Sequence, residues 1–279
     1  MAGHVRDILT DHEFQIVSDL VYRHCGIHLH AGKKELTCAR LSRRIRQAGF
    51  ANADEYLAYL RADSSGDEFG RLIDTISTNL THFFRERAHF DFLAERYLPG
   101  LLSHKQECGS RRIRGWSAGC SSGEEAYSLA ITLLESLGDR TGWDVRLLAI
   151  DISRPMLEHA RRGVYESSRV EAVPPDLRGR YFTTAEDDGR TEYRANQDLR
   201  QMIRFNYLNL IESWPFDGTF DFIFCRNVMI YFDKATQQNL VTRFYQCLEG
   251  GGVLFTGHAE SLTGISHRFR CVLPTVYVK

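Results

Sequence analysis

Features that direct a chain to membranes or to nucleic acid are missing from this sequence. No apolar run is long enough to span a bilayer, and the N-terminus has no apolar core like that of a signal peptide. The 35 Lys and Arg residues nearly balance the 36 Asp and Glu residues, so the net charge of -1 gives no overall attraction for a polyanion. These absences predict a cytoplasmic protein that does not insert into membranes or bind nucleic acid.

The common metal and redox motifs are missing too. The seven cysteines never occur in Cys-x-x-Cys spacing, and the eleven histidines form no His-Glu-x-x-His motif. Their scatter and odd number predict free thiols in a reducing compartment, and no metal site is expected. With 279 residues, the chain can form one large domain or two modest ones.

The clearest pattern lies between residues 111 and 137. Residues 113–116 suit a short buried strand, residues 117–123 form a turn of small residues, and apolar residues recur at helical spacing from residue 124 to residue 137. A strand, a small-residue loop and a helix in this order are the first unit of an open α/β sheet.

The turn between this strand and this helix carries a further signal. Its spacing, Gly119-x-x-x-Gly123, does not match a dinucleotide fingerprint, and Glu124 and Glu125 would repel a triphosphate. The loop therefore favours a cationic or hydroxyl-rich ligand, and S-adenosylmethionine (SAM) has both a sulfonium and an ammonium group. The alternative is that these residues only turn the chain into a helix.

Before this unit, residues 10–80 have the pattern of an all-helical region. A helix expected over residues 32–48 has one apolar side and one basic side. The basic side contains Arg40, Arg43, Arg44 and Arg46. It is either a solvated helix face or a docking surface for an acidic partner. A further helix is expected from residue 88, ending near residues 99–100.

After the central unit, two buried strands are expected, over residues 145–150 and 220–225. The first ends at Asp151, which could accept hydrogen bonds from the ribose hydroxyls of an adenosine. The alternative is a helix cap, in which Asp151 or Ser153 starts the next helix. Arg226 and Asn227 follow the second strand, at the edge where open α/β sheets hold ligands. Residues 163–205 between them look like an inserted segment with a small hairpin.

Several runs of residues occur together in the order found in one known family. They are Asn79-Leu80-Thr81-x-Phe83-Phe84-Arg85, Gly123-Glu124-Glu125-x-Tyr127-Ser128, Asp151, Asn209-Leu210 and the run from Phe224 to Phe232 that contains Cys225-Arg226-Asn227-Val228-Met229-Ile230-Tyr231. With these runs the chain resembles the bacterial chemotaxis receptor methyltransferases, the CheR family, over nearly its whole length.

The resemblance implies a fold and a domain plan. The fold is α/β: a Rossmann-like SAM-dependent methyltransferase domain with a small β insertion, preceded by an all-helical N-terminal domain. On this chain, residues 1–76 would be the helical substrate-docking domain, residues 77–95 a linker that contributes to the cofactor site, and residues 96–279 the methyltransferase domain. The insertion would span about residues 174–202.

The resemblance also implies a function, which is transfer of a methyl group from SAM to glutamates on chemoreceptor cytoplasmic helices. Nothing in the sequence signals an oligomer, so a monomer is expected. The implied SAM-contacting positions are Asn79, Thr81, Arg85, Glu125, Asp151, Asn209, Leu210, Arg226 and Asn227. Arg85 and Tyr231 would be catalytic, and the four arginines of the basic helix would dock the receptor. Two alternatives are a non-catalytic adaptor that binds SAM or S-adenosylhomocysteine, and a SAM-dependent enzyme with another substrate.

Overall fold

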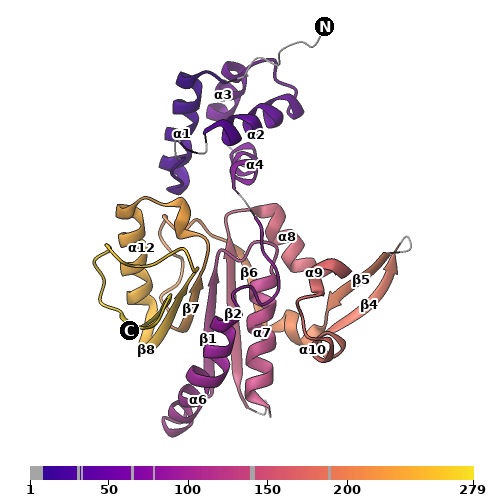
Figure 1. The fold of residues 1–279 in the computed structure, drawn as a ribbon, viewed down its shortest axis with the longest axis vertical. Coiled ribbons are helices and arrows are strands. Elements are labelled where there is room, and N and C mark those ends of the chain that lie inside the picture. Colours follow the sequence, from indigo (N-terminus) through magenta and orange to yellow (C-terminus); the bar gives the residue numbers. More distant parts are fainter. Residues whose placement is uncertain are drawn as a thin grey trace.

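The structure is a computed structural model that describes residues 9–29, 32, 34–63, 66–77, 79–138, 142–187 and 190–279. A unit of helices at the top of Figure 1 precedes a larger unit built on a β-sheet. A small second sheet projects from one side of the larger unit. This arrangement confirms the predicted fold class, an all-helical N-terminal part followed by an α/β part with a β insertion.

The N-terminal unit owes its helix boundaries to local capping. Its helices are α1 (Asp11–Cys25), α2 (Lys34–Gln47), α3 (Ala53–Ala62) and α4 (Asp67–Ile76). Thr10 and Glu13 form a reciprocal capping box at the start of α1, and Gly26 ends it with a φ of 72°. At α3 the Asn52 side chain is the N-cap and accepts from the Glu55 amide.

Three consecutive helical elements without a break precede the first strand of the main sheet. They are α5 (Ala88–Phe92), a π-helical turn η2 (Leu93–Tyr97) and α6 (Leu98–Glu107). The expectation that this helix ends near residues 99–100 is wrong. The amide of Leu98 bonds to the carbonyl of Leu93, so a wider turn precedes Pro99, which then lies in the first turn of α6. The missing N–H of proline costs little at that position.

The larger unit is organised by a seven-stranded sheet with the order β6-β2-β1-β7-β8-β10-β9. Its strands are β1 (Arg112–Ala118), β2 (Asp144–Asp151), β6 (Ile203–Tyr207), β7 (Phe220–Cys225), β8 (Leu248–Thr256), β9 (Arg270–Leu273) and β10 (Val276–Val278). The first five in this order are parallel, and β10 runs antiparallel to both neighbours. The chain changes direction across the sheet between β1 and β7, where doubly wound sheets hold ligands.

Both faces of this sheet are buried. Helices α7 (Glu124–Leu137) and α11 (Gln197–Met202) pack with the apolar cluster on one face, while α12 (Lys234–Cys247) packs with the cluster on the other. Successive residues of β7 alternate between them, with Phe222 and Phe224 on the α7 side and Ile223 and Cys225 on the α12 side. Burial on two sides explains why β7 is apolar at five of six positions in the sequence.

The insertion follows α8 (Arg154–Arg162) and forms a three-stranded sheet with the order β3-β5-β4. Its elements are β3 (Val164–Glu166), α9 (Ser167–Val170), α10 (Pro175–Tyr181), β4 (Phe182–Asp187) and β5 (Arg190–Ala195). The small sheet therefore lies within the inserted segment expected over residues 163–205, and it begins before the boundary near residue 174 that the resemblance implies. Three residues of β3 are too few to give an alternating pattern, so the sequence did not reveal that strand. The hairpin tip at residues 188–189 lies outside the described residues.

The helical unit packs on the edge of the main sheet where the parallel strands end. Ile27 forms an isolated bridge with Phe232, and the Tyr22 hydroxyl donates to Asp233 over 2.6 Å. Across the same junction, the Asn209 side-chain amide donates to the carbonyl of His24. Within the described residues, no helix combines the length and apolar character that crossing a membrane requires.

Candidate functional site

A cavity of about 350 Å³ lies where the helical unit meets the carboxyl ends of the parallel strands. This volume is in the range of small-molecule sites. The structure brings every sequence-predicted cofactor and catalytic position onto its wall: Asn79, Thr81, Arg85, Glu125, Asp151, Asn209, Leu210, Arg226, Asn227 and Tyr231. These residues come from segments far apart in the chain, and their individual roles remain predictions.

The loop between β1 and α7 passes close to other segments at two glycines. Gly119 has a φ of 107°, and a Cβ there would lie 2.3 Å from Cγ2 of Val228. Gly123 has a φ of 101°, and a Cβ there would come within 2.8 Å of Ala160 and of the Tyr165 hydroxyl. The sequence therefore needs glycine at both positions for steric reasons, whatever the ligand.

Asp151 is the last residue of β2 and lines this cavity. Its carboxylate accepts hydrogen bonds from two loops, the one before α7 and the one before α8. One oxygen accepts from the Ser121 amide over 2.7 Å and the other from the Ser153 amide over 2.9 Å. Of the two candidate caps of α8, Asp151 and Ser153, the structure selects Ser153, whose hydroxyl accepts from the Met156 amide. Each carboxylate oxygen can accept a second hydrogen bond, which leaves Asp151 able to bind hydroxyl groups in the cavity.

A buried ion pair joins the two sides of the cavity. The Arg226 Nε donates to Glu125 over 3.0 Å, and the Ser117 hydroxyl donates to the other oxygen of that carboxylate over 2.7 Å. Both charged side chains are less than one-tenth exposed. Burial raises the pKa of Glu125, and Arg226 and Ser117 oppose that rise.

His89 continues this network, although no pattern in the sequence singles it out. An Arg226 Nη1 lies 3.2 Å from His89 Nδ1, while His89 Nε2 lies 2.8 Å from the Thr275 hydroxyl oxygen. That hydroxyl donates to the carbonyl of Pro274, so it accepts from His89. Arginine can only donate, so both contacts require the neutral tautomer with its proton on Nε2.

Glu260 is a second residue that sequence reasoning missed. Its buried carboxylate accepts backbone amides from Asn227 over 2.6 Å, Gly257 over 2.7 Å and Ile230 over 3.0 Å. These bonds hold the loop after β7, in which Asn227 has a φ of 59°. The signal that could have found Glu260 is its position just beyond β8, at the same sheet edge as the other site residues.

The linker before α5 is held in an unusual backbone conformation. Phe84 and Glu86 have φ values of 52° and 56° although neither is glycine. The amide of Phe84 donates to the buried Ser128 hydroxyl, and the Arg85 guanidinium donates to the carbonyl of Leu80 over 2.8 Å. The turn thereby directs the half-buried Arg85 into the cavity wall.

The predicted docking face on α2 is only partly available. Arg44 makes two hydrogen bonds to the buried carboxylate of Glu68, and Arg40 donates to the carbonyls of Ile76 and Ser77. Docking by the four arginines stays a prediction, and Arg44 is the member whose charge compensates a carboxylate inside the helical unit. Arg43 and Arg46 are exposed, and neither lines the cavity.

Comparisons with known proteins identify the family. The model described as "CheR methyltransferase, SAM binding domain" matches residues 79–278, and the model "CheR methyltransferase, all-alpha domain" matches residues 12–77. This chain belongs to the CheR methyltransferase family. It is 40% identical to the chemotaxis protein methyltransferase of Borreliella burgdorferi, over 97% of this chain and 95% of that protein. It is 41% identical to chemotaxis protein methyltransferase 2 of Pseudomonas aeruginosa, over 96% and 93% of the two chains.

A CheR methyltransferase uses SAM, and the residues around this cavity fit that cofactor. The half-buried carboxylate of Asp151 retains acceptor positions suited to ribose hydroxyls. The Glu125–Arg226 pair presents a negative and a positive group side by side, which suits an ammonium and a carboxylate on one carbon. The cofactor of this protein is therefore SAM.

The buried His89 should make stability depend on pH. Burial and Arg226 lower its pKa to about 4, so between pH 6.5 and pH 4 the unfolded chain binds a proton that the folded chain does not. This effect should lower the free energy of unfolding by about 2 kcal/mol between pH 7 and pH 5. Urea unfolding at both pH values should show this loss in the wild type and not in His89→Gln.

The exposed His104 on α6 provides the control for this experiment. His104→Gln should retain the pH dependence of the wild type because it leaves the buried His89 and its contacts unchanged. Equal pH dependence in the wild type and in His89→Gln would contradict the assignment.

Proposed function

We propose that this methyltransferase transfers the methyl group of SAM to glutamate side chains on the cytoplasmic helices of chemoreceptors. The main support is one cavity at the carboxyl edge of the sheet, which is lined by every cofactor-binding and catalytic residue that the family resemblance selected. The names of the relatives support a role in chemotaxis. Receptor glutamates of this kind face the cytoplasm, so we place the enzyme there.

Methyl transfer to a glutamate carboxylate requires the protein mainly to position the two reacting groups. A glutamate side chain is ionised near neutral pH, so no general base is required. Bound SAM supplies an electrophilic methyl group on a positively charged sulfur. The protein must hold the carboxylate in line with that group and exclude water from it, and both effects can lower the barrier by several kcal/mol.

The charges on the cavity wall suggest how each end of the cofactor is held. We assign Asp151 to the ribose hydroxyls, and Glu125 with Arg226 to the ammonium and carboxylate groups. Asn79, Thr81 and Asn227 supply polar groups on the same wall, and Leu210 supplies an apolar surface. Asn209 has a further structural task, because its amide group donates to His24 of the helical unit and to Glu212.

Arg85 and Tyr231 lie on the cavity wall in the segments before α5 and after β7. We assign Arg85 to orienting the reacting carboxylate, because a guanidinium can hold a carboxylate through two parallel hydrogen bonds. Tyr231 would shape the pocket for the methyl group and donate a hydrogen bond. Its backbone carbonyl accepts from the His28 amide, which fixes the turn that carries it against the helical unit.

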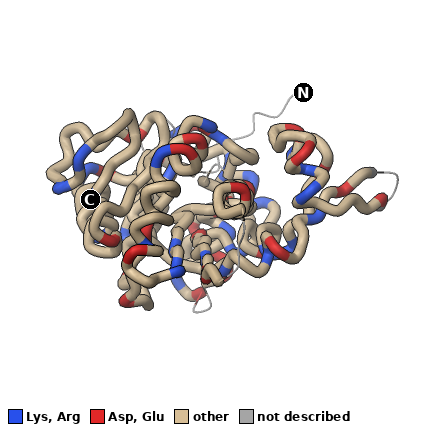
Figure 2. Tube along the Cα trace, turned by 90° about the horizontal axis from the view of Figure 1, so that it is seen from below, with Lys and Arg blue, Asp and Glu red and all other residues tan. Residues whose placement is uncertain are grey.

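The receptor would approach along the helical unit. Arg43 and Arg46 are the exposed members of the basic group on α2, and acidic receptor helices would be attracted to them. Elsewhere, Lys and Arg residues are mixed with Asp and Glu residues along the trace, as Figure 2 shows from below. That mixture favours a local protein contact over a nucleic-acid surface. We further propose that the enzyme acts as a monomer.

Replacing Asp151 should remove most of the affinity for SAM. The half-buried acceptor contributes hydrogen bonds worth about 1–3 kcal/mol, so calorimetric titration of Asp151→Ala should show binding weakened by about tenfold or more. Asp151→Asn keeps one acceptor oxygen for the loop amides and should fold while still binding SAM weakly. Asp217→Ala, which removes an exposed carboxylate from a loop, should bind like the wild type. Wild-type affinity in both Asp151 variants would sink the assignment.

Removing the Arg85 guanidinium should slow methyl transfer by on the order of 100-fold, because an unoriented carboxylate rarely attacks in line. Incorporation of labelled methyl groups into receptor membranes measures this rate. Arg87→Ala is the matched control, since Arg87 is two residues away and its side chain is 59% exposed. Near-normal turnover by Arg85→Ala would show that Arg85 has no catalytic role.

Reversing the exposed charges on α2 should weaken receptor binding and leave SAM binding intact. The double variant Arg43→Glu/Arg46→Glu is expected to raise the receptor KM by about tenfold or more, because two attractions become repulsions. Arg61→Glu, on the exposed side of α3, should have a much smaller effect. An unchanged receptor KM in the double variant would count against α2 as the docking surface.

A further inference from the structure

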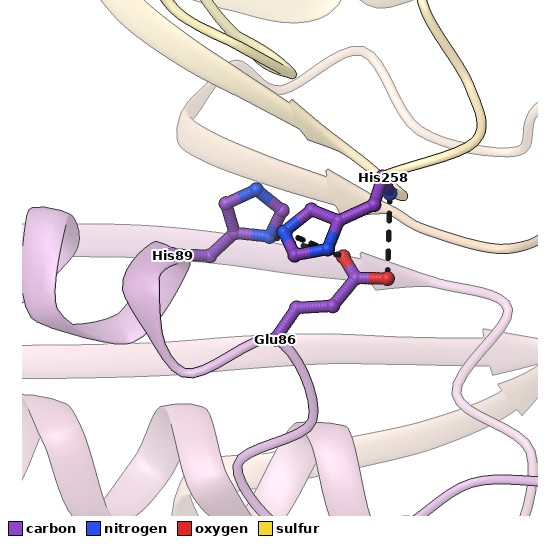
Figure 3. A group of neighbouring side chains, drawn as sticks. All are labelled: Glu86, His89 and His258. Carbon is purple, nitrogen blue, oxygen red and sulfur yellow. Dashed lines mark hydrogen bonds and ion pairs between the residues drawn. The ribbon is translucent and has the colours of Figure 1, made fainter.

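A cluster of two histidines and one carboxylate lies beside the cavity. Glu86 and His89 come from the linker and the start of α5, and His258 comes from the loop after β8 (Figure 3). One ligand atom from each of the three residues lies within 4.8 Å of the other two. Nothing in the proposed methyl transfer uses this cluster, and the sequence did not reveal it because its members are up to 172 positions apart.

The carboxylate of Glu86 is incompletely satisfied. Oε1 lies 3.3 Å from the His258 amide and 3.5 Å from the Asn227 side-chain amide, whereas Oε2 has no hydrogen-bond partner among the described residues. The Glu86 side chain is only 10% exposed. A buried carboxylate oxygen without a partner is costly, and this one faces the two imidazole rings (Figure 3).

His89 is already held in the tautomer that a metal ligand needs. Its Nε2 proton is donated to the Thr275 hydroxyl, so the lone pair of Nδ1 faces the cluster. A histidine that binds a metal through one nitrogen commonly donates a hydrogen bond from the other, which fixes the ring. Burial lowers the pKa of His89 to about 4, so the ring is neutral near pH 7.

The distances are close to those of a small coordination sphere. His89 Nδ1 lies 3.5 Å from Glu86 Oε2, and His258 Nε2 lies 3.9 Å from the same oxygen. Ligands of a tetrahedral zinc ion at about 2.0–2.1 Å are roughly 3.3–3.4 Å apart. The His258 side chain is 63% exposed, so its ring can rotate by the small amount required.

We propose that Glu86, His89 and His258 bind a divalent transition-metal ion of the zinc type, with water completing its coordination. Two imidazoles and one carboxylate suit this class, whereas calcium and magnesium prefer sites made entirely of oxygen ligands. The arrangement is open on the His258 side, so the ion can exchange with solvent.

Occupation of this site would act on the cofactor cavity through Arg226. The metal takes the Nδ1 lone pair that now accepts from Arg226, so the ion and that hydrogen bond exclude each other. Arg226 also pairs with Glu125 on the cavity wall, and a nearby dication repels its guanidinium. The metal should therefore weaken cofactor binding, and the cofactor should weaken metal binding by the same factor.

Calorimetric titration of the full-length protein with Zn²⁺, without cofactor, tests the site. Cys108 is exposed and its sulfur lies 3.9 Å from a ring nitrogen of His104, so every protein should carry Cys108→Ser to remove this competing pair. The background protein is expected to bind one equivalent of Zn²⁺. His258→Ala should weaken that binding tenfold or more, whereas His267→Ala, which removes another exposed histidine after β8, should not.

Absence of one-equivalent binding in the background protein would overturn the proposal, and so would equal binding in His258→Ala. Visible absorption of Co²⁺ added in place of Zn²⁺ provides a second measurement, because the band intensity depends on the ligand geometry. The effect of the metal on cofactor binding rests on the proposed function and is measured separately. The Zn²⁺-loaded protein is expected to bind S-adenosylhomocysteine at least threefold more weakly than the metal-free protein. The metal titration does not depend on that result.

Discussion

The buried pair of Glu125 and Arg226 is the interaction on which the site depends. Glu125 begins α7 after β1, and Arg226 follows β7, so the pair crosses the point where the chain changes direction in the sheet. Ser117 and His89 complete its hydrogen bonds and extend it to β1 and to α5. Two charges leave water at this point, and the surrounding hydrogen bonds compensate for the lost solvation.

Strained backbone is concentrated around the same cavity. Phe84, Glu86, Ser121 and Asn227 all have positive φ values without being glycine. Each such residue costs of order 1–3 kcal/mol, and it persists only where neighbouring groups hold it. Two carboxylates provide much of that hold, since Asp151 accepts the Ser121 amide and Glu260 accepts the Asn227 amide. The strained loops around the site therefore lower the free energy of unfolding, and the packing of apolar residues on the two faces of the sheet raises it.

Much of the fold followed from local patterns in the sequence. The boundaries of β7 and α7 agree with the expected ones because a run that is apolar at all but one position and a strong helical repeat are local signals. The three-residue strand β3 and the π turn before Pro99 were missed because each depends on its packing neighbours. Among the site residues, those at strand ends were found and His89 and Glu260 were not. Short-range patterns do not show which buried histidine or glutamate will turn toward the sheet edge.

The sequence by itself determined the class of protein, and its resemblance to a known family selected the residues that line the cofactor cavity, because the runs that carry the resemblance occur in the family's order. Tertiary structure decided how they combine. It turned Arg44 inward to compensate the buried Glu68, and it left Arg43 and Arg46 in solvent. It also brought Glu86, His89 and His258 together from two distant segments. These outcomes depend on long-range packing, which no local pattern in the chain encodes.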